Sequence, residues 1–461
     1  MGLGNKREFF FVSLITILAT ILIARGMTRP FEYDELYTAF FFVDTKSFWE
    51  TISTYLAFNN HIGFSVIARV FLKLFGKDEW IVRLPAIIFG GASVPAFYVL
   101  CRYIFNGNSA LVSTFLFAIS PFLVLQASMA RGYSALTFFS ILSASLFLKL
   151  VRSYTKNNLI LLIIVNSLAH YFHLYGFFIT LTELFVVLLI SLKNRISVNR
   201  NIVLALFGSI LLSAILYLPA ATGFYQSMTH FHGRAFNPSF PSQLLHAFVG
   251  NISNWLSCAF GLLLLIGALS FFKKDLLIGL FSASILLLPL AIAWSISPRF
   301  LYPRFFAFAV PFFVLLCGSG INSFLRSKFF VLKIMSIVFT VLLSYHWLNT
   351  SVLPKPTEGF REAVRLAEID ATNNAPLCSL GGGAPLYGYY TKREIVTPSS
   401  FDEFVDLKTR VGSVICLYRP SSWEPEHHKK IADYIKKNGT YKAIDNIEFL
   451  EFSKNRDYSQ Q

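Results

Sequence analysis

FFFVSLITILATILIARGMTRPFEYDELYT, residues 9–38, is the stretch that decides the fold. It opens with an apolar run over residues 9–25, close to the roughly 20 residues that cross a bilayer. Lys6 and Arg7 precede this run, and Ala24-Arg25-Gly26 stands where a small-residue cleavage site would be needed. The pattern predicts an uncleaved membrane anchor that leads directly into a polar outer segment.

The rest of the chain repeats the apolar pattern. Hydrophobic residues make up 55% of the 461 residues and charged residues 14%, with a mean hydropathy of +0.57, whereas a soluble domain carries about 25% charged residues. This composition excludes a disordered chain, a collagen-like repeat and a disulfide scaffold. Apolar spans are expected near residues 9–25, 80–101, 109–126, 133–150, 158–173, 174–192, 201–219, 252–272, 276–296, 302–320 and 329–348. We therefore predict a polytopic α-helical membrane protein with about eleven transmembrane helices.

One further apolar stretch is too short to cross. Residues 62–75, IGFSVIARVFLKLF, carry Arg69 and Lys73 four residues apart, on one ridge of a helix. This pattern indicates an amphipathic helix on the membrane surface. A full crossing here would invert every later helix, so residues 26–79 are interpreted as the first outer loop.

The basic residues set the orientation. Residues 351–461 hold 15 bases and 15 acids, so the whole net charge of +15 belongs to residues 1–350. With a cytoplasmic N-terminus, the inner segments hold 14 bases, and the short outer loops hold only Arg131, Arg234, Arg299 and Arg304. This bias follows the positive-inside rule and places the C-terminal region outside the cell. We expect no nucleic-acid partner, because no soluble segment carries a basic stripe.

The chain changes character after about residue 355. Strands are predicted over residues 376–380, 413–418 and 444–452, and helices over 358–373 and 425–438. Alternating strands and helices predict a small α/β domain over residues 351–461, outside the cell, that follows a transmembrane domain over residues 1–350. Gly381-Gly382-Gly383 is interpreted as a turn, because it does not match a phosphate-binding fingerprint.

Cys378 and Cys416 fall in two of the predicted strands. A disulfide outside the cell is one interpretation. Two small, buried, apolar residues are the favoured one.

Acidic residues gather in the first outer loop. Seven of the ten acids of residues 1–350 lie there, namely Glu32, Asp34, Glu35, Asp44, Glu50, Asp78 and Glu79. A solvated loop is one interpretation of this cluster. The Asp34-Glu35 pair also suits a general base, because a low dielectric and a neighbouring like charge raise a carboxyl pKa toward the working pH.

The four outer arginines oppose the topological bias, and three of them lie at or between spans. Arg131 lies at the outer start of a span, and Arg299 and Arg304 lie between two spans. A guanidinium at the outer interface can bind a phosphate through two parallel hydrogen bonds. Snorkelling or pairing with an acid is the alternative. Phosphate binding is favoured for Arg131 and Arg304 over Arg299.

Histidines and one acid accompany the spans. His170 and His173 lie three residues apart at the outer junction of two spans. They could bind a metal, but spacing fixes no third ligand, so hydrogen bonding is favoured and use of a divalent cation stays open. Glu183 is a lone acid within a predicted span, which is either a functional residue or the partner of a neighbouring helix.

Several motifs occur in a fixed order. After Asp34-Glu35 come His61, RLPAIIFG at residues 83–90, ARGYS at 130–134, HYFHLYG at 170–176 and PRFFAFAVPF at 303–312. In this series the sequence resembles the GT-C membrane glycosyltransferases that are related to protein O-mannosyltransferases and to the aminoarabinose transferase of lipid A. The resemblance covers residues 1–350.

The resemblance implies sugar transfer from a polyprenyl-phosphate donor to an acceptor hydroxyl at the outer membrane face. Asp34, beside Glu35, would be the general base. The donor phosphate would contact Arg131, Arg304, Lys73 and Arg299. Substrate would contact Tyr37, His61, Tyr133, His170 and His173. The implied partners are the lipid-linked donor, membrane lipids and an acceptor that is an envelope lipid, a polysaccharide or a protein.

The sequence also departs from the family pattern. Leu36-Tyr37-Thr38 stands where relatives often carry a basic residue, and Ile62-Gly63 follows His61 where relatives often carry prolines. Residues 126–134 lack the second outer acid of the aminoarabinose branch, so that branch's sugar and acceptor are not carried over. The competing hypotheses are a transporter or flippase for lipid-linked sugars and a scaffold protein without catalysis.

Overall fold

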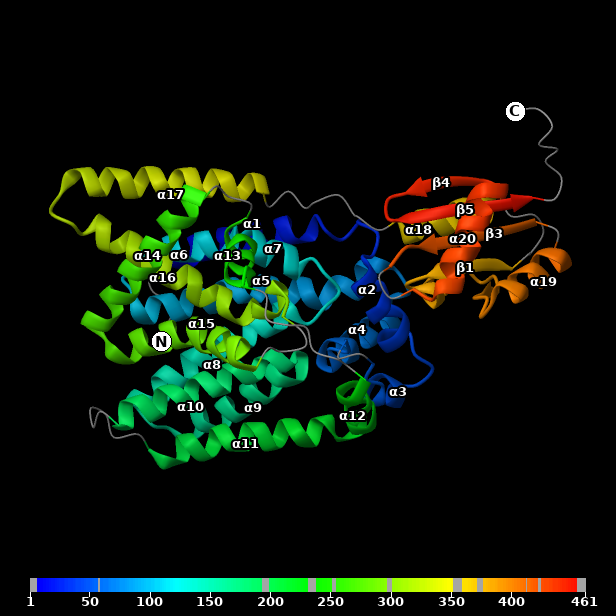
Figure 1. Ribbon diagram of the computed structural model, residues 1–461. Coiled ribbons are helices and arrows are strands. Elements are labelled where there is room, and N and C mark those ends of the chain that lie inside the picture. Colours follow the sequence, from blue (N-terminus) through cyan, green and yellow to red (C-terminus); the bar gives the residue numbers. More distant parts are fainter. Residues whose placement is uncertain are drawn as a thin grey trace. The chain divides into compact units, whose positions relative to one another are not determined.

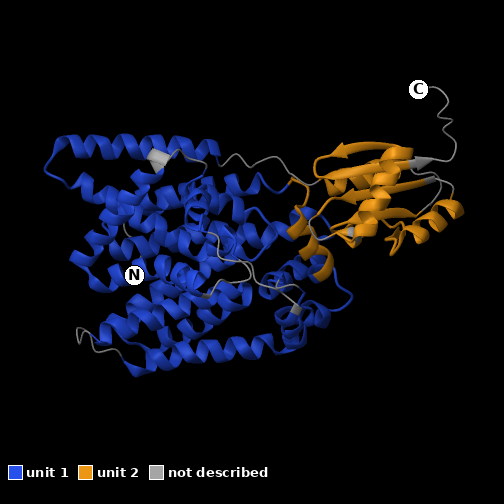
Figure 2. Ribbon diagram, viewed as in Figure 1, with its two compact units in different colours: residues 1–27, 42–353 blue, residues 28–41, 354–461 orange. Residues whose placement is uncertain are grey.

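The computed structural model describes residues 6–56, 59–192, 199–230, 238–250, 254–296, 301–350, 359–370, 376–411, 413–421 and 424–453. The chain divides into two compact units, Met1–Met27 with Phe42–Leu353 and Thr28–Phe41 with Pro354–Gln461 (Figure 2). The second unit thus contains a segment from the first outer loop, and this segment carries Asp34.

Long apolar helices form the first unit (Figure 1). Within the described residues, nine helices are long and apolar enough to cross a membrane, and a bent pair raises the count to ten. The nine are α1 (Lys6–Ala24), α5 (Glu79–Ile104), α8 (Tyr133–Arg152), α10 (Phe177–Leu192), α11 (Arg200–Tyr217), α14 (Asn254–Lys274), α15 (Leu276–Ile296), α16 (Val310–Leu325) and α17 (Phe330–Thr350). The polytopic helical architecture is confirmed.

The count is lower than the predicted eleven for two reasons. The predicted span near residues 109–126 is broken into α6 (Gly107–Ala118) and α7 (Pro121–Ala127), which meet at 53°. Pro121 lacks an amide hydrogen and disfavours helical geometry in the residue before it, and Ser120 accordingly has ψ 125°. The predicted span near 158–173 is α9 (Lys156–Phe172), which has only 17 residues.

Shorter helices connect the long ones. The amphipathic helix predicted over residues 62–75 is present as α4 (Ile62–Phe75). The others in this unit are α3 (Phe48–Ser53), α12 (Ala221–His230), α13 (Phe240–Val249), η2 (Leu174–Gly176), η3 (Leu218–Ala220) and η4 (Pro303–Ala309), and η1 (Ala39–Val43) links residues of both units.

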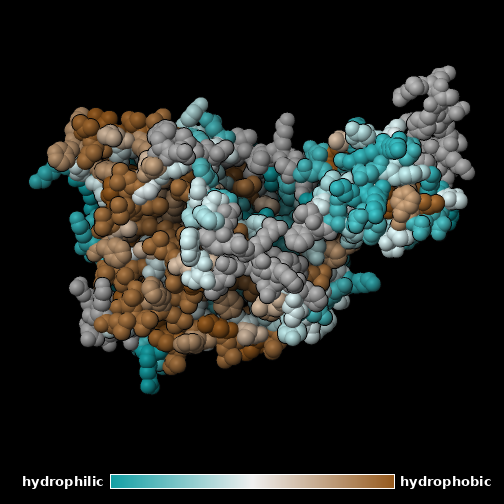
Figure 3. Space-filling model, in the orientation of Figure 1, coloured by the Kyte–Doolittle hydropathy of each residue, from teal (hydrophilic) through white to brown (hydrophobic). Residues whose placement is uncertain are grey.

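The helices of the first unit differ in how much of their surface is buried. The most apolar stretch of η4 and α16 is 94% buried, whereas that of α17 is only 17% buried. Leu14, Ile17, Leu287 and Val341 are among the large apolar side chains that remain exposed, and apolar residues dominate the surface of these helices in Figure 3. Apolar side chains on the outer surface suit contact with lipid. The backbone polar groups of each helix are satisfied within the helix, as the bilayer core requires.

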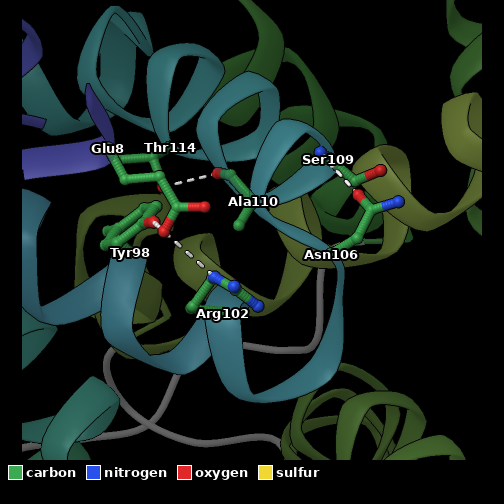
Figure 4. A network of polar contacts seen from close by, with 7 residues as sticks. All are labelled: Glu8, Tyr98, Arg102, Asn106, Ser109, Ala110 and Thr114. Carbon is green, nitrogen blue, oxygen red and sulfur yellow. Dashed lines mark hydrogen bonds and ion pairs between the residues drawn. The ribbon is translucent and has the colours of Figure 1, made fainter. Parts of the chain in front are cut away.

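A polar network fixes the start of α1 to α5 (Figure 4). The Tyr98 hydroxyl donates to the Glu8 carboxylate at 2.6 Å, and Arg102 Nε donates to the same oxygen at 3.2 Å. Asn106 Oδ1 accepts the Ser109 amide at 3.0 Å and caps α6 nearby. One acid near the N-terminus therefore joins two spans at the same end.

The second unit contains a five-stranded mixed sheet. The strands β1 (Leu377–Gly381), β2 (Ile395–Val396), β3 (Ser413–Arg419), β4 (Thr440–Ile444) and β5 (Ile447–Ser453) lie in the order β2-β1-β3-β5-β4. β1 pairs in parallel with β2 and β3, and β5 pairs antiparallel with β3 and β4. The helical elements are α2 (Tyr33–Thr38), α18 (Phe360–Asp370), η5 (Ala384–Tyr389), α19 (Phe401–Val411) and α20 (Glu426–Asn438). The predicted small α/β domain is confirmed, although α19, β2 and β4 were not foreseen.

This strand pairing explains the conformation of the glycine triplet and the bond between the two cysteines. Gly381 and Gly383 adopt φ of 78° and 99°, a region that suits glycine, so the turn prediction is confirmed. Cys378 and Cys416 are register partners in β1 and β3 and form a disulfide. The favoured expectation of two free thiols is therefore wrong, because strand pairing places them opposite each other.

Candidate functional site

A buried cation lies at the centre of the candidate site in the first unit. Arg131 precedes α8 and is 2% exposed. Its guanidinium donates to the Asn59 carbonyl at 3.2 Å and to Asn59 Oδ1 at 2.5 Å. Its Nη2 also lies 2.8 Å from His61 Nε2. These contacts fix the guanidinium in one orientation, which a planar fork allows and a lysine would not.

His61 is the imidazole next to this cation. It stands at the N-cap of α4, and its Nδ1 lies 3.2 Å from the Gly132 amide nitrogen. Burial lowers the pKa of His61 well below its ordinary value, and the charges of Arg131 and Arg304 lower it further. The ring is therefore neutral at pH 7, so it can accept a hydrogen bond from Arg131.

His173 is the second imidazole of the cluster. It lies between α9 and α10, and its Nδ1 accepts the Tyr175 amide at 3.0 Å. The centroid of its ring is 4.6 Å from that of His61. Burial lowers the pKa of His173 to about 3, with further contributions from Arg131 and Arg304. Both imidazoles are neutral at pH 7.

Arg304 is the second cation close enough to act on both rings. It lies at the start of η4, with its guanidinium carbon 4.7 Å from the Tyr302 ring centroid and 5.7 Å from that of Phe305. Two guanidiniums thus act on the same pair of neutral imidazoles. We call Arg131, Arg304, His61, His173 and Tyr133 the cation cluster, and its positive charge suits an anion.

Tyr133 gives the cluster a hydroxyl. It begins α8, and its ring centroid lies 5.2 Å from that of His61 and 5.4 Å from that of His173. Its hydroxyl is buried and has no hydrogen-bond partner among the residues that the structure describes. A buried hydroxyl without a partner costs free energy, so this group can form a hydrogen bond with a ligand that enters the cluster.

The carboxylates of the second unit lie on α2. The Glu32 amide donates to Glu35 Oε2 at 3.1 Å, as in a capping box. Glu35 is fully buried, whereas Asp34 is half-buried, and the Asp34 carbonyl accepts the Thr38 hydroxyl at 2.9 Å. Glu35 therefore stabilises the start of the helix, and Asp34 is the better placed of the pair to act on a substrate.

Tyr37, a predicted substrate contact, also lies on α2. Its ring centroid is 4.5 Å from that of Phe41 and 6.0 Å from that of Tyr33. Burial raises the pKa of Tyr37 to about 12. The phenol is thus neutral at pH 7 and can donate a hydrogen bond.

Lys73 is not brought to the cation cluster. It is exposed on α4 and follows His61 by twelve residues, which corresponds to about 18 Å along a helix. Arg69, on the same ridge, is buried and donates to the carbonyls of Val43 and Thr45 at 3.0 and 2.7 Å. Arg299 lies outside the described residues.

His170 has a hydrogen-bonded position of its own. Its Nδ1 lies 2.6 Å from Ser213 Oγ and its Nε2 2.9 Å from Thr180 Oγ1, and its ring stacks on Phe177. Both ring nitrogens therefore face hydroxyls, as expected for the hydrogen-bonding interpretation. In the part of the chain that the structure describes, no three His, Cys, Asp or Glu side chains are arranged to hold a metal ion.

Glu183 joins three helices. Its carboxyl on α10 lies 2.6 Å from Ser143 Oγ on α8 and 2.7 Å from Asn166 Nδ2 on α9. Ser143 Oγ also lies 2.5 Å from Asn166 Oδ1. The serine has one proton, so all three contacts can be hydrogen bonds only if Glu183 is protonated, whichever way the amide is oriented. The acid is thus the partner of neighbouring helices.

Asn59 and Asn60 were missed by the sequence analysis. Asn59 orients Arg131, and the Asn60 amide donates to the carbonyls of Thr51 and Thr54 at 3.2 and 2.8 Å. Two asparagines directly before the N-cap residue of a helix are a signal of side-chain to backbone bonding. The sequence therefore indicated that the asparagines form such bonds, but it did not indicate that Asn59 bonds the distant Arg131.

Comparisons with known proteins agree with this architecture. Residues 59–219 match the family of dolichyl-phosphate-mannose-protein mannosyltransferases. The structure of ArnT from Cupriavidus metallidurans bound to undecaprenyl phosphate is similar, with a TM-score of 0.61 and 12% identity over 97% of this chain and 98% of that chain. The archaeal oligosaccharyltransferase AglB from Archaeoglobus fulgidus, in complex with an inhibitory peptide and a dolichol-phosphate, has a TM-score of 0.56 and 11% identity over 89% and 70%. Among the curated proteins no match is found.

The fold and the matched region show what this protein is similar to. It is a multi-pass membrane protein with a fold similar to those of ArnT and AglB, and part of its first unit matches the mannosyltransferase family. The resemblance seen in the motif series is confirmed, and the matched residues 59–219 contain four members of the cation cluster, His61, Arg131, Tyr133 and His173.

Proposed function

We propose that this protein transfers a sugar from a polyprenyl-phosphate donor to an acceptor hydroxyl at the outer membrane face. The observation that carries the proposal is the cation cluster, in which Arg131 and Arg304 act on two neutral imidazoles beside a Tyr133 hydroxyl that has no hydrogen-bond partner among the described residues. The lipid phosphates bound by ArnT and AglB support the same class of donor.

The cluster explains how the leaving group would be stabilised. When the bond between C1 of the sugar and the phosphate oxygen breaks, its electron pair stays on the phosphate. Fixed cations that face this growing charge lower the barrier, because they need no reorganisation during the reaction. Arg131 is held in advance by Asn59, and Tyr133 can donate one further hydrogen bond.

Asp34 is the proposed general base. Its carboxylate accepts the proton of the acceptor hydroxyl while that oxygen attacks C1, and the polyprenyl phosphate leaves from the opposite side. The configuration at C1 is inverted. Glu35 keeps α2 capped, so it supports the base without accepting the proton.

The proposed orientation has a cytoplasmic N-terminus and an outer C-terminal domain. It rests on the positive-inside bias of residues 1–350. The Cys378–Cys416 disulfide supports it, because such bonds persist in oxidising compartments. A membrane-impermeant thiol reagent tests it on intact cells, with Cys258→Ser as background and a cysteine in place of the exposed Lys437. Labelling only after the membrane is opened would refute this orientation.

Transfer is tested with purified protein in detergent. A panel of polyprenyl-phosphate sugars is offered with envelope extract as the acceptor source, and both donor loss and sugar appearance are measured. Asp34→Asn should abolish transfer, whereas Asp402→Asn, the same change at an exposed acid of α19, should not. Full transfer by Asp34→Asn would refute the base assignment.

One further comparison tests the phosphate contact, and one outcome would favour a competing function. Arg131→Lys keeps the charge but loses the fork, so it should weaken donor use less than Arg131→Ala. Tight donor binding without consumption, together with donor movement across vesicle bilayers, would favour the transporter hypothesis.

A further inference from the structure

The segment that carries Asp34 is structurally part of the C-terminal domain. Residues Thr28–Phe41 and Pro354–Gln461 form one compact unit, although more than three hundred residues of sequence separate them (Figure 2). In sequence the segment follows directly on the first span. Its side chains, however, pack on residues of the domain that ends the chain.

Tyr33, the residue before Asp34, makes the principal contact. The Arg419 guanidinium carbon lies 4.4 Å from the Tyr33 ring centroid. The ring of Phe360, the first residue of α18, lies 6.3 Å from that of Tyr33, and Arg419 lies 6.0 Å from the Phe360 ring. One guanidinium thus lies near the rings of both the base-bearing helix and α18.

The glycine turn holds Arg419 in this place. Gly381 is the register partner of Arg419 at the ends of β1 and β3, and the Gly382 amide donates to the Arg419 carbonyl at 3.0 Å. A Cβ at Gly383 would come within 3.0 Å of the Tyr33 ring. The triplet therefore fixes the backbone of Arg419 and leaves room for the tyrosine.

Two more aromatic side chains of the segment, one on each side of Asp34, lie against the C-terminal domain. Phe31 is fully buried, and its ring centroid lies 5.8 Å from that of Tyr389. Phe40, at the other end, comes near Gly388, where a Cβ would lie 3.6 Å from its ring. The backbone around Asp34 is thus set by the C-terminal domain.

We propose that Arg419 is a positioning residue for Asp34, acting through the Tyr33 ring. This inference rests on the proposed function, in which Asp34 is the base. A cation over an aromatic ring restrains that ring, and Tyr33 and Asp34 share the first turn of α2. The C-terminal domain then serves catalysis by holding the base.

The kinetic test compares Arg419→Ala with Arg410→Ala, an exposed arginine of α19. Loss of the cation–π contact should lower kcat by roughly 3- to 30-fold, while the KM for the donor stays unchanged because the phosphate contacts are intact. Arg419→Lys should restore part of kcat. Tyr33→Phe keeps the ring and should retain more activity than Tyr33→Leu.

A second measurement does not depend on catalytic activity, so it tests the inference separately from the proposed function. Amide hydrogen exchange of residues 28–41 should accelerate in the full-length Arg419→Ala protein and stay unchanged in Arg410→Ala. Unchanged exchange in Arg419→Ala would refute the positioning role even if Asp34→Asn is inactive. Accelerated exchange with a fully active Asp34→Asn would instead refute the base assignment alone.

Discussion

Removal of the Cys378–Cys416 disulfide gives the sharpest test of the second unit. The bond links adjacent strands and closes a loop of 38 residues. Closing a loop of that length removes entropy from the unfolded chain worth about 4 kcal/mol at 25 °C. We therefore expect Cys378→Ala/Cys416→Ala to lower the free energy of unfolding of this unit by about that amount.

Pulse proteolysis of the full-length protein in urea measures this loss. With a urea slope of roughly 1–3 kcal/mol per molar, the midpoint for cleavage within residues 359–453 should fall by roughly 1.3–4 M. Cys258→Ser, which removes an exposed free thiol, is the control and should leave the midpoint unchanged.

Thiol counting decides which step fails if the midpoint does not move. Three of the five cysteines, Cys101, Cys258 and Cys317, are free, so denatured protein should bind three maleimides before reduction and five after it. Five maleimides before reduction would show that the bond is absent. Three maleimides before reduction, together with an unchanged urea midpoint, would refute the loop-entropy argument.

Three further predictions concern the first unit. Glu183→Gln should preserve stability and transfer, because an amide reproduces every hydrogen bond of a protonated acid, whereas Glu183→Ala should lower the thermal midpoint; a Glu183→Gln protein as unstable as Glu183→Ala would mean that the acid is ionised. Because the pKa of His173 falls to about 3 in the folded state, the unfolded chain binds the extra proton below pH 6.5, and stability should drop by about 2 kcal/mol between pH 7 and 5. Thermal unfolding of His173→Gln at both pH values should show a drop smaller by that amount, and an equal drop would contradict the neutral assignment. Arg69→Met should destabilise the unit by at least about 2 kcal/mol, because two buried carbonyls lose their donor, with Arg69→Lys as the milder control; equal midpoints for wild type and Arg69→Met would contradict this.

Local patterns in the sequence predicted much of the fold. Hydropathy found the long spans, and the amphipathic spacing of residues 62–75 found α4 with its bounds. The bend at Pro121 carried only a partial signal, because proline can kink or end a helix, yet Pro85 and Pro95 lie inside the continuous helix α5. The short helix α19 was missed although Phe401, Phe404 and Leu407 have the spacing of one helix face.

The site followed the same division. Motif order pointed to Asp34, Arg131 and Arg304 because these residue types stand out at an outer membrane face. It did not reveal that Asn59 orients Arg131 or that Asn166 and Ser143 surround Glu183. Such contacts join residues that are distant along the chain, and local sequence patterns do not show which distant residues meet.

The sequence by itself determined the class of fold, because transfer of apolar side chains from water to lipid depends on local composition. It also predicted the orientation, because flanking charges bias insertion. Only the tertiary structure decided that Cys378 meets Cys416 and that the segment bearing Asp34 packs with residues beyond 354. Both depend on which strands and rings pair across long loops, and that choice rests on the packing of the whole unit.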